Sequence, residues 1–329
     1  MKDLKIAVVI PSYKVTKHIL AVIDSIGPEC ELIFVVDDCC PDKSGEFVKA
    51  HVNDPRVMVL FHEKNRGVGG AVMTGYRAAL EVGAEIIVKI DGDGQMDPKL
   101  ILNFIEPLIN RDADYVKGNR FHSVYNVRKM PAVRLFGNAV LSFITKLSSG
   151  YWSIFDPTNG YTAIHASALS RIELKNISER YFFESDMMVN LGGVRAVIRD
   201  IPMEAVYSDE VSGLKIKTVI LEFLVKHMRE LFKRVVYSYF LRDFNLASTN
   251  LLAGLLLTGF GIIFGGIEWA HSNSTNIPAT SGTVIIATLP IILGFQLLLS
   301  FLTFDIANEP KIPLQRLPDM RPVFKERSL

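Results

Sequence analysis

Two aspartates separated by a single glycine, Asp91 and Asp93, directly follow the apolar run at residues 86–90. A run rich in β-branched residues predicts a buried strand, and side chains two residues apart at a strand end point the same way. The glycines at positions 92 and 94 let another group approach the backbone closely. Paired carboxylates beside such an opening suit a divalent cation shared with phosphate groups. Taken alone, these residues fit a polar turn equally well, because Asp and Gly are common in turns.

Further polar motifs follow other apolar runs, at the points where additional strands are predicted to end. These motifs are Pro11-Ser12-Tyr13, Asp37-Asp38, residues 65–71 and Gly118-Asn119-Arg120. Because the ends of parallel strands line one edge of a sheet, the motifs can converge on one crevice. The glycine-rich stretch 65–71 fits a phosphate-binding helix N-terminus and equally a tight turn. It does not complete a dinucleotide fingerprint, because position 72 is Val and the stretch follows the third strand.

The elements that would position these motifs alternate between strands and helices. Strands are predicted at residues 5–10, 32–37, 57–61, 85–90 and 115–117, and helices at 17–25, 44–52, 70–82 and 98–110. This alternation predicts an α/β fold with a mostly parallel, doubly wound sheet. The helix at 98–110 has a clear start, with Asp97 as N-cap and Pro98 in the first position. Between residues 120 and 208 we expect helices at 133–147 and 184–191 and a strand at 194–201.

Charge and cysteine content narrow the classes of function. The 329 residues carry 36 Lys and Arg against 35 Asp and Glu, so binding of bulk nucleic acid has no electrostatic support. Three cysteines cannot build a disulfide framework, and none forms a zinc-type C-x-x-C pair. A reducing, cytoplasmic setting fits the first part of the chain.

The last third of the chain contains two long apolar segments. Residues 246–267 contain no charged residue over 22 positions, and residues 281–304 contain none over 24. A bilayer core requires roughly 20 such residues per helix, so two transmembrane helices are predicted. Lys and Arg are frequent on the outer flanks and absent from the connecting loop 271–282, which places the catalytic part in the cytoplasm.

A basic amphipathic pattern at residues 214–242 precedes the two apolar segments. Such a pattern is typical of a helix in a membrane interface, and an ordinary surface helix is the alternative. The tail from residue 308 carries four prolines and is expected to be extended or disordered. We therefore predict a catalytic domain at 1–213, a juxtamembrane helix region at 214–243, two transmembrane helices at 244–305 and a cytoplasmic tail at 306–329.

The polar motifs occur in an order that resembles family 2 glycosyltransferases with the GT-A fold. The motifs that carry this resemblance are Pro11-Ser12-Tyr13, Val36-Asp37-Asp38, Asn65-Arg66-Gly67-x-Gly69, Asp91-Gly92-Asp93-x-Gln95-x-Asp97-Pro98, Gly118-x-Arg120 and Asp156-x-Thr158-x-Gly160-Tyr161. The pattern is most similar to polyprenyl-phosphate glycosyltransferases, a group that includes dolichol-phosphate mannose synthases. The two trailing helices match the bacterial membrane-anchored branch. The resemblance covers about residues 6–214.

The resemblance implies roles for particular residues. Donor-binding roles fall to Pro11, Tyr13, Asp37, Asp38, Asn65, Gly67, Asp91 and Arg120. The implied ligands of Mg²⁺ or Mn²⁺ are Asp91, Asp93 and Gln95. Catalytic roles fall to Asp156, Asp93 and Arg120, and acceptor-binding roles to Arg128, Arg134, Glu184 and Lys215. The chain departs from the family pattern at Lys14-Val15, at Cys39-Cys40, and at 207–215, where the usual Arg before Gly-x-Ser-Lys is missing.

The resemblance predicts an inverting, metal-dependent glycosyltransferase that loads a sugar onto a polyprenyl phosphate. The reaction would occur at the cytoplasmic face of the inner (plasma) membrane, with the bilayer as partner. UDP-glucose is the favoured donor, with UDP-N-acetylglucosamine and GDP-mannose left open, and a homo-oligomer is compatible with the anchor. The alternatives are a glycosyltransferase that acts on a lipid or polysaccharide hydroxyl and an inactive membrane scaffold.

Overall fold

The computed structural model describes residues 4–122, 132–204 and 216–317. The chain divides into two compact units, which are treated separately below. The first comprises residues 1–230 together with 310–329, and the second comprises residues 231–309.

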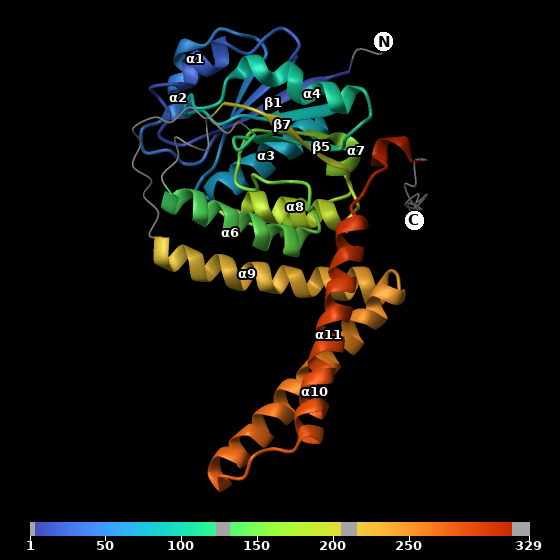
Figure 1. The fold of residues 1–329 in the computed structure, drawn as a ribbon. Coiled ribbons are helices and arrows are strands. Elements are labelled where there is room, and N and C mark those ends of the chain that lie inside the picture. The colour runs from blue at the N-terminus through green and yellow to red at the C-terminus, as the bar shows by residue number, and fades with distance from the viewer. Residues whose placement is uncertain (1–3, 123–131, 205–215, 318–329) are drawn as a thin grey trace, which may run out of the picture. The chain divides into compact units, whose positions relative to one another are not determined.

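The first unit is built on one seven-stranded sheet (Figure 1). Its strands are β1 (Ile6–Ser12), β2 (Leu32–Asp37), β3 (Val57–Phe61), β4 (Ile86–Lys89), β5 (Tyr115–Asn119), β6 (Thr162–His165) and β7 (Ile198–Pro202). They lie in the order β3-β2-β1-β4-β6-β5-β7. Only β6 runs antiparallel to its neighbours β4 and β5. The prediction of an α/β fold with a mostly parallel sheet is therefore confirmed.

Helices cover both faces of this sheet. The helices of this part of the chain are α1 (Ile19–Asp24), α2 (Ser44–His51), α3 (Gly67–Glu81), α4 (Ile101–Ile109), α6 (Ala132–Ser149), α7 (Ala166–Leu169) and α8 (Phe183–Gly193), followed by α9 (Ile216–Val236), which runs past residue 230. Figure 1 shows α1, α2 and α4 on one side of the sheet and α3 and α8 on the other. Alternate residues of β1 divide between the two cores: Val8 faces the first set of helices and Val9 the second. Burial on both faces explains why these strands are almost continuously apolar.

Most predicted elements agree with the structure to within a few residues, and β2 and β3 agree in full. The Asp97 side chain accepts a hydrogen bond from the Lys99 N–H, as expected of an N-cap, although the helix opens with a 3₁₀ turn. The strand predicted at 194–201 is wrong at its start, because α8 continues to Gly193 and β7 begins only at Ile198. The four-residue β6 was not predicted, since it is too short to show a clear period.

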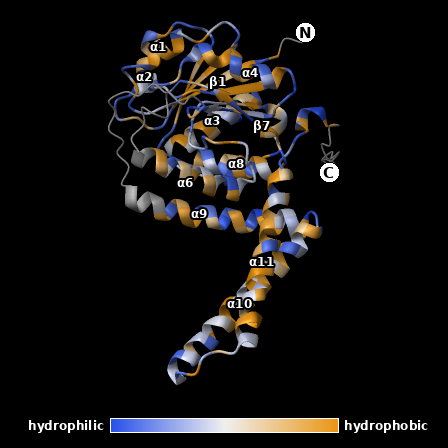
Figure 2. Cartoon of the chain, in the orientation of Figure 1, coloured by the Kyte–Doolittle hydropathy of each residue, from blue (hydrophilic) through white to orange (hydrophobic). Residues whose placement is uncertain are grey.

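The second unit contains an antiparallel pair of long helices, α10 (Leu246–Thr275) and α11 (Ser281–Ala307). By length and composition both could cross a membrane, and Figure 2 shows mainly hydrophobic residues along them. A Cβ added at Gly261 would lie 2.7 Å from the Ala287 carbonyl oxygen, and one at Gly294 2.9 Å from that of Gly254. Glycine at these positions therefore lets the two helices pack closely.

Part of the C-terminal tail belongs to the first unit. Leu314 is 3% exposed and joins the core, and its N–H donates to the Asp114 carboxylate at 2.8 Å. The Gln315 side chain donates to the carbonyl oxygens of Leu108 and Ala113 at 3.1 and 2.7 Å. The expectation of an extended or disordered tail is therefore wrong for these residues, because a buried leucine and backbone hydrogen bonds hold them.

Candidate active site

The loops that follow β1 and β4 meet at the carboxyl-terminal edge of the sheet. A Cβ added at Gly92 would lie 3.1 Å from the Val15 side chain, and one at Gly94 would lie 3.3 Å from that of His18. Gly94 also has a φ of 76°, a left-handed conformation that favours glycine. The glycines around Asp93 therefore allow the two loops to pack together. This brings the motif Pro11-Ser12-Tyr13 close to the motif that begins at Asp91.

Asp91 lies beside a buried lysine from the strand that precedes it. The Nζ of Lys89 is 2.7 Å from Asp91 Oδ1, while the Asp91 side chain remains 29% exposed and that of Lys89 only 1%. A Cβ added at Gly160 would lie 2.8 Å from Asp91 Oδ2 and would also collide with Lys89 Nζ. Glycine at position 160 therefore leaves the space in which the ion pair and the second carboxylate oxygen lie.

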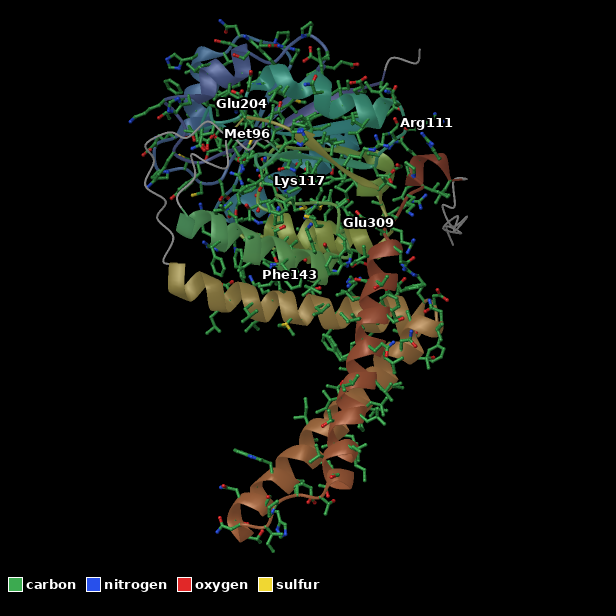
Figure 3. All side chains as sticks on the ribbon, in the orientation of Figure 1. Met96, Arg111, Lys117, Phe143, Glu204 and Glu309 are labelled. Carbon is green, nitrogen blue, oxygen red and sulfur yellow. The ribbon has the colours of Figure 1, made fainter. Side chains whose placement is uncertain are left out.

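A second buried lysine lies in the same row of the sheet. Lys89 on β4 and Lys117 on β5 both pair with Thr162 on β6, so the three side chains share one face. Lys117 is fully buried and donates a hydrogen bond to the carbonyl oxygen of Asn159. Figure 3 shows Lys117 in the interior of the first unit.

Glu184, at the start of α8, belongs to the same cluster of charges. Its Oε1 is 3.9 Å from Lys89 Nζ. Burial raises the pKa of Glu184, although the ammonium groups of Lys89 and Lys117 oppose this. Burial lowers the pKa of Lys117 to about 8, against the attraction of Glu184 and Asp156. For Lys89, burial is outweighed by the charges of Asp91 and Glu184, and the pKa is raised.

Asp156 and Arg120, two predicted catalytic residues, bind each other. Arg120 Nε donates to Asp156 Oδ2 at 2.8 Å, and Nη2 donates to Oδ1 at 2.9 Å. The Arg120 N–H approaches the same carboxylate at 3.2 Å, and Asp156 is fully buried. A bidentate, charge-assisted pair of this kind engages both carboxylate oxygens and fixes their orientation.

The carboxylates of Asp37 and Asp38 accept hydrogen bonds from backbone N–H groups that follow β2 and β3. Asp37 accepts from the N–H groups of Cys40 at 2.7 Å and Gly45 at 2.6 Å. Asp38 accepts from the N–H groups of Arg66 at 2.8 Å and Gly67 at 2.7 Å. Both aspartates are 3% exposed. They therefore shape the loops after β2 and β3, and their donor-binding role stays a prediction.

The glycine-rich start of α3 is covered by a later segment of the chain. The N–H of Gly70 donates to the Glu179 carbonyl oxygen at 3.0 Å, and a Cβ added at Gly67 would lie 2.6 Å from that oxygen. With Asp38 accepting the Gly67 N–H, the helix N-terminus binds protein groups. In this structure the stretch 65–71 thus contacts the segment that leads into Glu184, and the donor-binding roles of Asn65 and Gly67 stay predictions.

The remaining predicted site residues fall into three groups. Tyr13 is 44% exposed beside the β1 loop, Pro11 is half-buried at the end of β1, and Asn65 donates to the Asp38 carbonyl oxygen at 3.1 Å. Gln95 donates its N–H to Asp93 Oδ1 at 2.9 Å. Arg128 and Lys215 lie outside the described residues, and Arg134 lies in α6, where its side chain is not described. Their acceptor-binding roles therefore stay predictions.

The residues at the end of β4 suit a metal that is only partly held by protein. Among the described residues, no three His, Cys, Asp or Glu side chains come close enough together to hold an ion unaided. Mg²⁺ is commonly bound through one or two carboxylates plus substrate phosphates and water. Asp91, whose side chain is partly exposed although Oδ1 is buried against Lys89, fits that mode together with Asp93.

Sequence reasoning did not assign a role to Lys89, Lys117 or Gly160. A signal was present, because Lys89 and Lys117 interrupt strands that are otherwise apolar and such lysines are rarely buried unless paired. The partners could not be found in the same way, since Asn159 and Glu184 lie far along the chain.

Comparison with solved structures shows which fold this chain has. The fold is similar to that of glucosyl-3-phosphoglycerate synthase from Mycobacterium tuberculosis, solved with Mn²⁺, UDP and glucosyl-3-phosphoglycerate. The TM-score is 0.51 at 18% identity, over 70% of this chain and 80% of that one. At this identity the likeness shows the fold alone, a GT-A-like α/β fold.

The family follows from the sequence comparison. A model described as "Glycosyl transferase family 2" matches residues 7–173, and the chain belongs to this family of glycosyltransferases. It is 32% identical to UDP-N-acetylglucosamine–dolichyl-phosphate N-acetylglucosaminyltransferase of Methanococcus voltae, over 64% of this chain and 88% of the relative. It is 29% identical to undecaprenyl-phosphate mannosyltransferase of Micrococcus luteus, over 61% and 83%. The predicted family and enzyme class are therefore confirmed.

Proposed function

We propose that this glycosyltransferase moves a sugar from a nucleotide-sugar donor to a polyprenyl phosphate at a membrane surface, with inversion at the anomeric carbon. The observation that carries the proposal is Asp91 at the end of β4, whose Oδ1 is buried against Lys89 while its side chain remains 29% exposed. The names of the relatives support the acceptor class, because both join a sugar to a lipid phosphate.

The proposed donor differs from the one expected from sequence. The relatives named above carry N-acetylglucosamine and mannose in their names rather than glucose. UDP-N-acetylglucosamine is therefore the first donor we propose, ahead of a mannose donor and of UDP-glucose.

In the proposed reaction, an oxygen of the lipid phosphate attacks the anomeric carbon while the bond to the nucleoside diphosphate breaks. The bonding electron pair leaves with the diphosphate. Asp91 and Asp93, with Gln95 beside them, would hold Mg²⁺ or Mn²⁺, which when bound supplies positive charge against the departing diphosphate. Arg120 holds Asp156 in place at the end of β5.

A lipid phosphate as acceptor is consistent with the contacts that Asp156 makes with Arg120. A phosphate monoester has a second pKa of about 6 and is largely dianionic at neutral pH, so it can attack without a base. A hydroxyl acceptor would need a carboxylate base, and Asp156 is engaged by Arg120 on both oxygens. This favours a lipid phosphate over the alternative of a lipid or polysaccharide hydroxyl.

The second unit supports the proposed membrane setting. Two helices long and apolar enough to cross a bilayer would keep the enzyme beside an acceptor that cannot leave the membrane. We propose a multi-pass protein of the inner (plasma) membrane, with the catalytic unit in the cytoplasm and α9 in the interface. The predicted domain boundaries and a homo-oligomer are retained as part of this proposal.

A donor panel tests the function directly. The purified chain, with undecaprenyl phosphate in detergent, is incubated with radiolabelled UDP-N-acetylglucosamine, a mannose donor or UDP-glucose, with and without EDTA. We expect label in a lipid released by mild acid, loss of the product with EDTA, and a fall of at least about 10²-fold in Asp91→Asn. Asp24→Asn, an exposed change on α1, serves as control. Near-normal turnover of Asp91→Asn at saturating metal would overturn the proposal.

A further inference from the structure

Lys89 is an unusual residue for the strand in which it lies. The other three residues of β4 are apolar, and all four are buried. Lys89 Nζ is 2.7 Å from Asp91 Oδ1 and 3.9 Å from Glu184 Oε1. Apart from this ion pair, neither Nζ nor Asp91 Oδ1 has a hydrogen-bond partner among the described residues. A buried ammonium is costly unless it is paired, so Asp91 and Glu184 are what keep it there.

The ion pair distinguishes the two oxygens of Asp91. Oδ1 is buried against Lys89, whereas the Asp91 side chain as a whole remains 29% exposed. A cation that approaches Asp91 thus finds Oδ1 already in contact with an ammonium. It also meets a positive charge a few ångströms away, in a region screened from water.

We infer that Lys89 is a positioning residue that holds Oδ1 of Asp91, leaves Oδ2 for the divalent cation, and shifts the binding preference of the site from the cation alone towards the nucleoside diphosphate. The inference rests on the proposed function, because it takes Asp91 as a metal ligand. The ammonium offsets one of the two carboxylate charges of Asp91 and Asp93. It therefore weakens the attraction for a cation alone and strengthens that for the diphosphate that follows.

The neighbouring lysine provides a matched control. Lys117 is as buried as Lys89, lies in the same row of the sheet and faces the same side. It is two strands away, roughly 10 Å across the sheet, and it donates to the Asn159 carbonyl oxygen rather than to Asp91. Loss of its charge removes a buried ammonium without disturbing the Asp91 contact.

The experiment measures binding rather than turnover. Mn²⁺ affinity is measured by electron paramagnetic resonance on the full chain in detergent, with and without UDP, and UDP affinity by calorimetry with and without saturating Mn²⁺. For Lys89→Met we expect Mn²⁺ alone to bind about tenfold more tightly or better. UDP should bind more weakly at saturating Mn²⁺, so the two affinities shift in opposite directions. Lys117→Met should keep both affinities close to those of the unmodified chain.

The outcomes separate the inference from the proposed function. Weaker binding of both ligands in Lys89→Met would indicate a purely structural role, and unchanged binding would indicate no role; either result overturns the inference. If Lys89→Met does not fold, Lys89→Gln provides a shorter, neutral side chain that still carries a hydrogen-bond donor, and it should behave as described for Met. If Asp91→Asn bound Mn²⁺ as tightly as the unmodified chain, the metal assignment of the proposed function would fall and the inference with it.

Discussion

The contact between Asp114 and the C-terminal segment gives a sharp stability prediction. The Asp114 carboxylate accepts the N–H groups of Val197 and Leu314, both at 2.8 Å, and that of Gln315 at 3.4 Å. Asp114 is fully buried and Leu314 is 3% exposed. In Asp114→Ala the N–H groups of Val197 and Leu314 lose their acceptor inside the protein, at a cost of about 1–3 kcal/mol each.

The expected loss is smaller than the sum of these costs. Burial raises the pKa of Asp114, so removing its charge recovers part of the cost of keeping it there. We expect the free energy of unfolding of the first unit to fall by about 3 kcal/mol in Asp114→Ala. Asp114→Asn keeps an oxygen that can accept from Val197 and Leu314, and we expect it to stay within about 1 kcal/mol of the unmodified chain.

The assay combines denaturation with proteolysis. The midpoint of chemical denaturation is compared for the unmodified chain, Asp114→Ala and Asp114→Asn, and protease cleavage is mapped within residues 310–317. Cleavage should appear in the alanine variant under conditions in which the asparagine variant is protected. Donor affinity should not change, because Asp114 precedes β5 and the site follows its other end. Equal denaturation midpoints for Asp114→Ala and Asp114→Asn, with residues 310–317 equally protected from cleavage in both, would contradict this prediction.

Two pH-dependent effects are also expected. The pKa of buried Lys117 is about 8, against 10.5 for a lysine side chain in water, so the folded chain loses a proton that the unfolded chain keeps. Between these values the free energy of unfolding should rise with pH, by up to about 3 kcal/mol from this residue, and Lys117→Met should flatten the rise in a pH series of denaturation curves. His227, whose Nδ1 lies 2.8 Å from Ser148 Oγ, has a pKa lowered to about 4 by burial. As pH falls from 6.5 towards 4, the part of α9 around His227 should lose hydrogen-exchange protection. His227→Phe should remove this dependence, and equal exchange in both chains would count against the prediction.

The sequence determined the parts of this protein that depend on local patterns. The strand runs, Asp97 as N-cap and the two long apolar segments can be recognised because period, capping and hydropathy are properties of neighbouring residues. The order of the polar motifs also indicated the family, which the family match confirms. The placement of Asp91 at the end of a strand follows from the same reasoning.

Tertiary structure alone decided which groups those residues meet. Lys89 pairs with Glu184, Arg120 with Asp156, and Asp114 with Leu314, across separations that no local pattern reports. Each is a buried charge whose partner depends on strand register and on which segment fills the remaining space. A sequence shows that a charge stands in an apolar run, but only the folded chain shows what neutralises it. For this enzyme, the sequence shows a pair of aspartates, and the folded chain adds that Lys89 holds one oxygen of Asp91.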